Sequence, residues 1–312
     1  MSTAAAAPAV SVVLAACEGE KYLAEQIDSV LAQTLKDFEL VILDDASTDG
    51  TAKVAFAAAR RDPRIRLERN PARLGIRRNF LKAVSMARGR AIAFCDQDDV
   101  WRPDKLEILL GLLDGNPENK LAYSDLEVVG EDLRPLAPSF WAAAGIRPRE
   151  GRLAERALFR NLSPGCSMMF VRGVKEAMDR LVPAPSFIAH DHLALILAAG
   201  MGRVVFTREK LVRYRQHAGN ALGSAGRGTG FGRASVAETL KEGASRLKGL
   251  VPMDWPRLEA FAAGLEGRSA GPRLRYLDYF LFMRDDRPSQ KLLGALECAA
   301  PGVYSALKGA RP

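Results

Sequence analysis

Four short runs that are typical of β-strands alternate with helical patterns over the first hundred residues of the chain. The runs cover residues 10–15, 38–43, 65–68 and 91–95. Between the first two, apolar side chains in residues 18–33 recur at the three- and four-residue spacing of a helix with one buried face. Strands that alternate with helices of this length favour a mainly parallel, doubly wound sheet with helices on both faces. The sequence therefore predicts an α/β fold.

The pattern continues beyond residue 100 and then changes near residue 219. We expect a helix after Pro103, strands at 121–129 and 204–206, and a helix at 188–199, with a long Pro-, Arg- and Gly-rich loop at 130–150. Residues 223–232 have the Gly/Ser/Arg composition of a linker, and helical stretches follow it. This shift predicts a catalytic domain at 1–218 and a linker with a C-terminal helical extension at 219–312.

Composition and charge restrict where such a chain works and what it binds. We find no apolar run of about 18 to 20 residues and no signal-peptide pattern, and the four cysteines have no paired spacing, which favours the cytoplasm. Residues 201–312 hold 19 Lys and Arg against 10 Asp and Glu, whereas residues 1–200 hold 26 against 27. The basic last third is typical of contact with a phosphate-bearing ligand, an anionic membrane or nucleic acid. No aromatic-interleaved basic motif or recognition-helix signature supports nucleic acid.

An acidic segment follows the fourth predicted strand. Three carboxylates, Asp96, Asp98 and Asp99, occupy four residues directly after the apolar run that ends at Cys95. Ligands bind at the carboxyl ends of the strands in open α/β sheets. Carboxylates crowded at such a place repel one another unless a cation lies between them, and Mg²⁺ and Mn²⁺ prefer oxygen ligands. The segment therefore predicts a divalent-cation site, against the alternative of a solvated acidic turn.

Several segments, in this order, resemble the inverting glycosyltransferases of family 2. They are Val12–Cys17, Val41–Thr51, Asn70 with Leu74, Gly75 and Asn79, Asp96–Trp101, and His190–His192. The resemblance covers roughly residues 10–218 and implies the GT-A fold. The Asp-Gln-Asp-Asp-Val-Trp segment and Tyr214–His217 are most similar to those of bacterial rhamnosyltransferases of surface polysaccharide synthesis. A nucleotide-sugar donor, dTDP-L-rhamnose or alternatively a UDP-sugar, and a saccharide or lipid-linked acceptor are implied.

The resemblance also implies roles for individual residues toward the donor. Asp45, with Asp44 beside it, is expected to accept the imide N–H of the base, although Ser47 and Asp49 also suit a helix cap. The remaining donor-side residues are Ala15, Ala16, Asn79, Asp96, Gln97 and Arg215. Asp98 is expected to ligate Mg²⁺ or Mn²⁺ with His217, and this metal neutralises the leaving diphosphate.

A second group of residues is assigned to the acceptor and to catalysis. Asp191 is expected to be the general base that deprotonates the acceptor hydroxyl, against the alternative of a helix N-cap. The residues expected beside the acceptor are Gly165, Cys166, His190 and His192. For Cys166 we expect a buried filler and not a nucleophile, because no basic group is tied to it in the sequence.

Other functions fit less well. A haloacid-dehalogenase phosphatase has an aspartate pair resembling Asp96 and Asp98, but after an early strand and before a Gly-Thr or Val-Thr pair. A dinucleotide-binding fold needs a Gly-x-Gly-x-x-Gly segment that the residues after Cys17 lack. A non-catalytic module of the same fold, binding nucleotide-sugar or polysaccharide, is disfavoured by the presence of both Asp98 and Asp191. For the basic last third we expect either peripheral contact with the inner face of the plasma membrane or a solvated helical cap.

Overall fold

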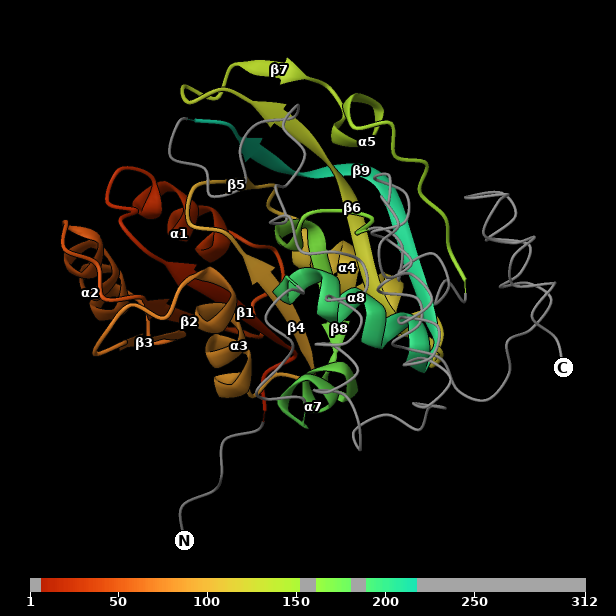
Figure 1. Ribbon diagram of the computed structural model, residues 1–312, viewed down its shortest axis with the longest axis horizontal. Helices are drawn as coiled ribbons and strands as arrows, with labels where there is room; N and C mark the ends of the chain where they lie inside the picture. Colours follow the sequence, from red (N-terminus) through yellow and green to blue (C-terminus); the bar gives the residue numbers. More distant parts are fainter. Residues whose placement is uncertain (1–6, 152–160, 181–188, 218–312) are drawn as a thin grey trace, which may run out of the picture. The chain divides into compact units, whose positions relative to one another are not determined.

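A mixed sheet of nine strands lies at the centre of the part of the chain that the structure describes (Figure 1). The structure is a computed structural model that describes residues 7–151, 161–180 and 189–217. These residues all belong to one compact unit. The strand order is β3-β2-β1-β4-β8-β6-β9-β5, with β7 paired to β6. The predicted C-terminal helical extension and its domain boundary lie outside the described residues.

The first half of the sheet is parallel, as the alternation of strands and helices predicts. It consists of β1 (Val10–Ala16), β2 (Phe38–Asp44), β3 (Ile65–Arg69) and β4 (Ala91–Cys95). The connecting helices are α1 (Leu23–Leu31), α2 (Thr51–Arg61) and α3 (Ile76–Met86). Ala16 is in register with Asp44, and Leu14 with Cys95. The acidic residues that follow β2 and β4 therefore reach the same edge of the sheet.

The second half of the sheet is mixed. β8 (Met168–Val171) runs antiparallel to β4 on one side and to β6 (Asn119–Val129) on the other. β6 pairs in parallel with β9 (Arg203–Arg215), with irregularities in register along its length. The short strands β5 (Val100–Trp101) and β7 (Pro135–Ala137) pair antiparallel to β9 and β6. Four further helices are described: α4 (Lys105–Asp114), α5 (Phe140–Ala143), α7 (Arg172–Arg180) and α8 (His190–Met201).

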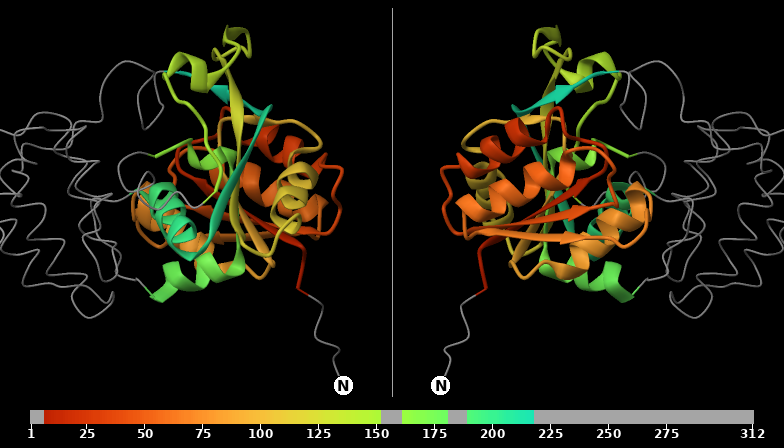
Figure 2. Two further views of the ribbon diagram at one scale, coloured as in Figure 1. Left: turned by 90° about the vertical axis from the view of Figure 1, so that its right-hand side faces the viewer. Right: turned by 90° about the vertical axis from the view of Figure 1, so that its left-hand side faces the viewer.

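Helices cover both faces of the sheet, because alternate strand residues point to opposite sides. Val10, Val12 and Leu14 of β1 join one buried cluster with Ile27 of α1 and Leu109 of α4. The helices α3, α7 and α8 pack against one another and against the strands. Figure 2 shows α4 and α8 on opposite sides of the sheet. This arrangement confirms the predicted layers.

Two local predictions were wrong and one short strand was missed, and each difference has a tertiary cause. The strand β5 at Val100 and Trp101 was not predicted, because it forms only through its pairing with Arg213 and Val212 of β9. β9 runs on to Arg215, well past the predicted 204–206, because β6 beside it supplies hydrogen-bond partners along its length. The expected loop 130–150 contains β7 and α5. No helix among the described residues has the length and apolar character to cross a membrane.

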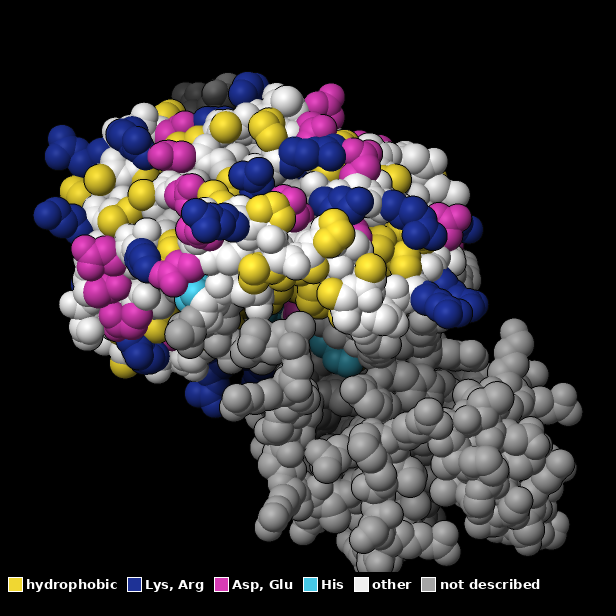
Figure 3. All heavy atoms as spheres, turned by 90° about the horizontal axis from the view of Figure 1, so that it is seen from above, with side chains coloured by type: hydrophobic (Ala, Val, Ile, Leu, Met, Phe, Trp, Pro, Cys, Tyr) yellow, Lys and Arg dark blue, Asp and Glu magenta, His cyan; other side chains and the backbone are white. Residues whose placement is uncertain are grey.

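The face seen from above in Figure 3 carries basic and acidic side chains side by side. The described residues on this face therefore form no continuous basic patch. The excess of Lys and Arg lies in residues 201–312, most of which lie outside the described ranges.

Candidate active site

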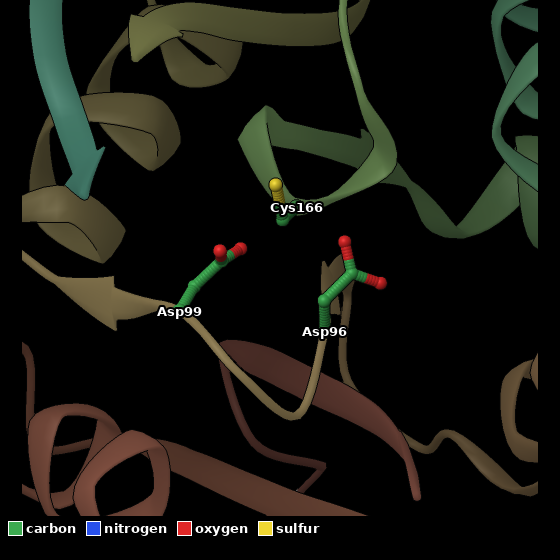
Figure 4. A group of neighbouring side chains, drawn as sticks. All are labelled: Asp96, Asp99 and Cys166. Atoms are coloured by element: carbon green, nitrogen blue, oxygen red, sulfur yellow. The ribbon is translucent and has the colours of Figure 1, made fainter. Parts of the chain in front are cut away.

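The acidic segment after β4 forms a loop against the turn that carries Cys166. The ligand atoms of Asp96, Asp99 and Cys166 lie within 4.8 Å of one another, and Figure 4 shows the three side chains beside one another. Gly165, Cys166 and Ser167 form a short 3-10 turn directly before β8. The loop and the turn come together because β8 pairs directly with β4.

Burial and mutual repulsion dominate the electrostatics of this loop. The pKa of Asp96 is raised to about 7, mainly by burial and further by the charges of Asp98 and Asp191. The pKa of Asp99 is raised well above its usual range, mainly by burial and further by the charges of Asp98 and Asp96. Asp99 is fully buried and accepts the backbone N–H of Arg215 at 3.0 Å. Its Oδ2 atom is buried with no hydrogen-bond partner among the described residues.

The two residues predicted to bind a metal, Asp98 and His217, are brought together. Nε2 of His217 lies 2.9 Å from Oδ2 of Asp98, and the imidazole packs on the ring of Tyr22 at 4.7 Å between centroids. Both side chains keep a small exposed fraction, 15% for Asp98 and 12% for His217. A carboxylate beside an imidazole, together with the buried, unpartnered Oδ2 of Asp99 in the same acidic loop, provides donor atoms that a hard divalent cation accepts. The residues present therefore suit Mg²⁺ or Mn²⁺.

Gln97 joins the acidic loop to the end of β1. Its Oε1 accepts the backbone N–H of Cys17 at 2.7 Å, and its Nε2 donates to the Cys17 carbonyl at 3.0 Å. A side chain added at Gly19 would overlap this amide, with a distance of 2.2 Å to Oε1. Gln97 therefore supports the loop, and Ala15 and Ala16, the last residues of β1, lie directly before the segment that it holds.

The predicted base-binding residues are occupied by contacts within the protein. Oδ1 of Asp45 accepts the Leu74 N–H at 2.7 Å and the Asn70 amide at 2.8 Å, and Oδ2 accepts the Gly75 N–H at 2.8 Å. Gly75 has a φ of +83°, which favours glycine. Asn79 accepts the Asn70 amide and donates to the Leu43 carbonyl. Asp45 and Asn79 therefore shape the segment 70–75 beside the end of β2.

Asp44 and Arg215 are also engaged by the protein. Asp44 is fully buried, accepts hydrogen bonds from Ser47 and lies 3.1 Å from Nε of Arg69. The guanidinium of Arg215, only 3% exposed, donates to the carbonyl of Asp98 at 2.7 Å, to the carbonyl of Glu131 and to the carboxylate of Glu25. This differs from the predicted contact with a diphosphate, because Arg215 would have to give up these bonds to reach one. In this structure Arg215 supports the acidic loop through its hydrogen bond to the carbonyl of Asp98.

Asp191 lies in the first turn of α8 and faces the acidic loop. The N-cap of α8 is Ala189, so the alternative prediction that Asp191 caps the helix is wrong. Its Oδ2 accepts the amide of Asn161 at 2.9 Å and its Oδ1 accepts the His192 N–H at 2.7 Å. The negative charge of Asp191 is one cause of the raised pKa of Asp96, so the two carboxylates lie close enough to repel each other.

Three of the residues predicted beside the acceptor, Gly165, His190 and His192, lie next to Asp191. A Cβ on Gly165 would lie 3.1 Å from the Cβ of Asp191 and 3.3 Å from Nε2 of His190, so glycine permits this close approach. The ring of His190 stacks on Phe80 at 3.8 Å between centroids, and burial lowers its pKa to about 4. His192 is buried. Burial raises the pKa of the Cys166 thiol, which agrees with a filler and not a nucleophile.

Three residues near the site were missed by the sequence interpretation. Asn161 donates a hydrogen bond to Asp191, which lies 30 residues further along the chain. Glu131 accepts hydrogen bonds from Lys21 and from Tyr22, whose ring packs on His217. Lys105 is fully buried at the start of α4. Of these three residues, only Lys105 could have been found from the sequence. It occupies a position of the apolar helical pattern that includes Leu106, Leu109 and Leu113.

The chain is similar to curated proteins of bacteria. It is 29% identical over 215 residues to an uncharacterised protein of Mycobacterium bovis, covering 67% of this chain and 59% of that protein. It is 40% identical over 103 residues to TuaG of Bacillus subtilis, named as a putative teichuronic acid biosynthesis glycosyltransferase, covering 32% of this chain and 40% of TuaG. The chain thus spans about three fifths of the length of the first curated relatives that it matches.

Solved structures share the fold. Residues 1–349 of TarS from S. aureus, in complex with UDP-GlcNAc, match with a TM-score of 0.59 at 18% identity, over 96% of this chain and 83% of that one. The mannosyltransferase PcManGT from Pyrobaculum calidifontis, in complex with GDP-Man and Mn²⁺, matches with a TM-score of 0.52 at 18% identity, over 97% and 84%. The predicted α/β GT-A fold is confirmed. A family model described as Glycosyl transferase family 2 matches residues 11–176, more than half of the 312 residues, and the chain belongs to this family.

Proposed function

We propose that this protein is a glycosyltransferase that moves a sugar from a nucleotide-diphosphate donor to a saccharide or lipid-linked saccharide acceptor, with inversion. The observation that carries the proposal is the meeting of Asp98, Asp96 and Asp191 at one edge of the sheet, where the charges of Asp98 and Asp191 both raise the pKa of Asp96. Membership of the family and the nucleotide-sugars bound by TarS and PcManGT support it.

The donor side binds the negatively charged diphosphate of the nucleotide-sugar in this proposal. Asp98 and His217 hold Mg²⁺ or Mn²⁺ in this proposal, and the metal supplies charge neutralisation to the leaving diphosphate. Gln97 and Arg215 keep the loop in place through the Cys17 backbone and the Asp98 carbonyl. Ala15, Ala16 and the segment shaped by Asp45 and Asn79 border the nucleotide. Their contribution is to exclude water and to fix the orientation of the donor.

The acceptor side provides the base. Asp191 takes the proton from the acceptor hydroxyl while that oxygen attacks the anomeric carbon on the face opposite the diphosphate, so that the product is inverted. The Asn161 amide holds Oδ2 of Asp191 and the His192 N–H holds Oδ1, which fixes the direction of the carboxylate. Gly165, Cys166, His190 and His192 border the acceptor. Proton transfer to a positioned base contributes about 10²- to 10⁴-fold in rate.

The finer specificity rests on similarity. The proposed donor is dTDP-L-rhamnose, with a UDP-sugar as the alternative, because Asp96–Trp101 and Tyr214–His217 resemble rhamnosyltransferase segments. Relatives such as TuaG support a role in polysaccharide synthesis. We assign catalysis to residues 1–218 and place the protein in the cytoplasm, with the basic residues 219–312 contacting the inner face of the plasma membrane.

A binding screen and two variants test the proposed function. Thermal shifts are measured across nucleotide-sugars with Mg²⁺ and with Mn²⁺, and transfer is followed with the best donor. Asp191→Asn is expected to keep donor binding and to lose about 10²- to 10⁴-fold in turnover. Asp98→Ala is expected to weaken donor binding only in the presence of the metal. Full turnover by Asp191→Asn removes this residue from the role of base, and stabilisation by donors without any turnover favours a non-catalytic binding module.

A further inference from the structure

Tyr22 is an aromatic residue beside the proposed metal ligands that the proposed chemistry does not use. It is the N-cap residue of α1, and it is partly buried. Its ring packs on the imidazole of His217, with 4.7 Å between the ring centroids and 40° between the ring planes. The guanidinium carbon of Arg215 also lies 4.7 Å from the centroid of the Tyr22 ring. Tyr22 therefore joins the start of α1 to the residues at and after the end of β9.

The hydroxyl of Tyr22 holds the ring at its other end. It donates to Oε1 of Glu131 at 2.7 Å, and Lys21 donates to the same oxygen. Glu131 lies in the turn between β6 and β7, and its carbonyl accepts the guanidinium of Arg215. The start of α1, this turn and the end of β9 therefore meet at Tyr22, although Tyr22 and Glu131 are 109 residues apart.

The plane of the His217 ring matters for a metal ligand. β9 ends at Arg215, which is in register with Val129 of β6, so side-chain contacts orient the imidazole two residues further on. The contact of Nε2 with Oδ2 of Asp98 at 2.9 Å fixes one ring atom but lets the ring turn about it. A lone pair of imidazole lies in the ring plane, so this plane sets the direction in which Nε2 faces a cation. The Tyr22 ring against the imidazole face restricts the turning, because aromatic pairs at this distance prefer defined arrangements.

Arg215 does not depend on Tyr22 in the same way. Its guanidinium also donates to the carbonyls of Asp98 and Glu131 and to the carboxylate of Glu25. These hydrogen bonds remain when the Tyr22 ring is removed. Loss of the ring is therefore expected to act on His217 more than on Arg215.

We propose that Tyr22 is a positioning residue for His217. Its ring holds the plane of the imidazole so that His217 and Asp98 face one cation together, and Glu131 holds the ring through the hydroxyl. Removing a group that orients a histidine ligand typically costs about 10- to 100-fold in metal affinity. The part that concerns the cation rests on the proposed function, whereas the ring contact is independent of it.

NMR of the metal-free protein tests the ring contact by itself. The chain has three histidines, and His217→Ala identifies the signals of His217. The ring current of Tyr22 is expected to shift the imidazole proton signals of His217. Tyr22→Phe is expected to keep this shift and Tyr22→Leu to remove it. Identical His217 signals in the wild type and in Tyr22→Leu overturn the proposal.

Both variants are expected to fold, because Tyr22 is partly exposed at the end of a helix. Their Tm is expected to lie within about 5 °C of that of the wild type. Tyr22→Met, which also lacks a ring, replaces Tyr22→Leu in every measurement if the leucine variant does not fold.

Nucleotide binding with and without Mn²⁺ tests the positioning. Calorimetry gives the affinities for UDP and for dTDP, and the gain in affinity that Mn²⁺ provides is compared between proteins. Tyr22→Leu is expected to reduce this gain by about 10-fold or more and to leave metal-free binding unchanged. Tyr22→Phe is expected to stay within about threefold of the wild type, because the exposed hydrogen bond that it loses contributes little. A purely structural role would not separate the two affinities.

The same change in a His217→Ala background shows whether Tyr22 acts through His217. Tyr22→Leu is expected to cost nothing further there, and an equal loss in both backgrounds overturns the proposal. The matched control is Phe38→Leu at the start of β2, which removes another ring that carries an arginine, Arg64 at 4.4 Å. This control is expected to leave the gain from Mn²⁺ unchanged, and a loss equal to that of Tyr22→Leu overturns the proposal.

The wild type separates failure of this inference from failure of the proposed function. A wild-type gain from Mn²⁺ that Tyr22→Leu retains in full overturns the role of Tyr22 alone. No gain from Mn²⁺ in the wild type with either nucleotide overturns the metal ligands of the proposed function, and the positioning role with them.

Discussion

At the scale of single residues, burial decides which ionisable groups are available for chemistry. Asp191 is held by two hydrogen bonds in a place where its charge reaches Asp96. Asp45 is held just as firmly, but by segment 70–75. The two aspartates look alike in sequence, since Asp45 directly follows a strand and Asp191 lies in the first turn of a helix. Their different partners separate a proposed base from a residue that shapes the binding site.

The buried histidine beside Asp191 makes the stability of the protein depend on pH. Burial lowers the pKa of His190 to about 4 in the folded protein, against an ordinary value of 6.5. Between these values the unfolded chain binds the proton more readily than the folded chain does. The contribution of neutral His190 to stability is therefore complete above pH 6.5 and is lost as the pH falls to 4, by up to about 3 kcal/mol.

His190→Phe is expected to remove this dependence, because a phenyl ring keeps the stacking on Phe80 without a titrating group. The check is the free energy of unfolding from urea titrations of both proteins at pH 4.5, 5.5 and 7. As the pH falls, the free energy of unfolding is expected to decrease more for the wild type than for the variant. A constant difference over this range contradicts the prediction.

At the scale of elements, the pairing of β8 with β4 brings the acceptor-side turn to the acidic loop. The turn Gly165–Ser167 directly precedes β8, and β8 is in register with β4 through Ile92 and Phe170. α8 then presents Asp191 against Gly165. Elements that are about seventy residues apart in the chain thus form one site, and their spacing depends on a single glycine.

Gly165→Ala is expected to reduce turnover by roughly 10- to 100-fold with little loss of stability. The new Cβ would lie 3.1 Å from the Cβ of Asp191, so the carboxylate must move by a few tenths of an ångström. The measurement is turnover beside a melting curve. Gly111→Ala is the matched control, because a Cβ there meets nothing within 4 Å in α4, and it is expected to stabilise by about 0.5–1 kcal/mol with unchanged turnover. Wild-type turnover in Gly165→Ala contradicts the role of this contact.

At the scale of the whole molecule, charge is divided between two parts of the chain. Residues 1–200 are nearly neutral, and they contain the acidic loop and Asp191. Residues 201–312 carry the excess of Lys and Arg. With the boundary at residue 218, residues 1–218 hold 31 Lys and Arg against 28 Asp and Glu, and residues 219–312 hold 14 against 9. A basic extension of this kind suits an enzyme whose acceptor is anchored at an anionic surface. This division predicts that binding of the donor and contact with a membrane are separable.

A chain of residues 1–218 is expected to keep Mn²⁺-dependent binding of the nucleotide diphosphate, because His217 and every other proposed ligand remain. It is expected to lose association with vesicles that contain anionic lipid, which the full chain retains at low salt. Calorimetry measures the first property and vesicle sedimentation the second. Equal sedimentation of both chains would contradict the membrane role of residues 219–312, and loss of nucleotide binding would contradict the domain boundary.

Local patterns in the sequence were sufficient for the alternation of strands and helices over the first hundred residues, for the α/β class and for the family, because hydrophobic periodicity and short motifs act over a few residues. They were also sufficient to point to Asp96, Asp98 and Asp191, since these follow or begin elements with clear signals. Only the tertiary structure decided which polar side chains are already engaged by the protein, among them Asp44, Asp45, Asn79 and Arg215. It also decided that β5 is a strand and that Lys105 donates to the carbonyl of Cys166. These outcomes depend on partners up to 190 residues away, and such long-range contacts leave no periodic trace in the sequence.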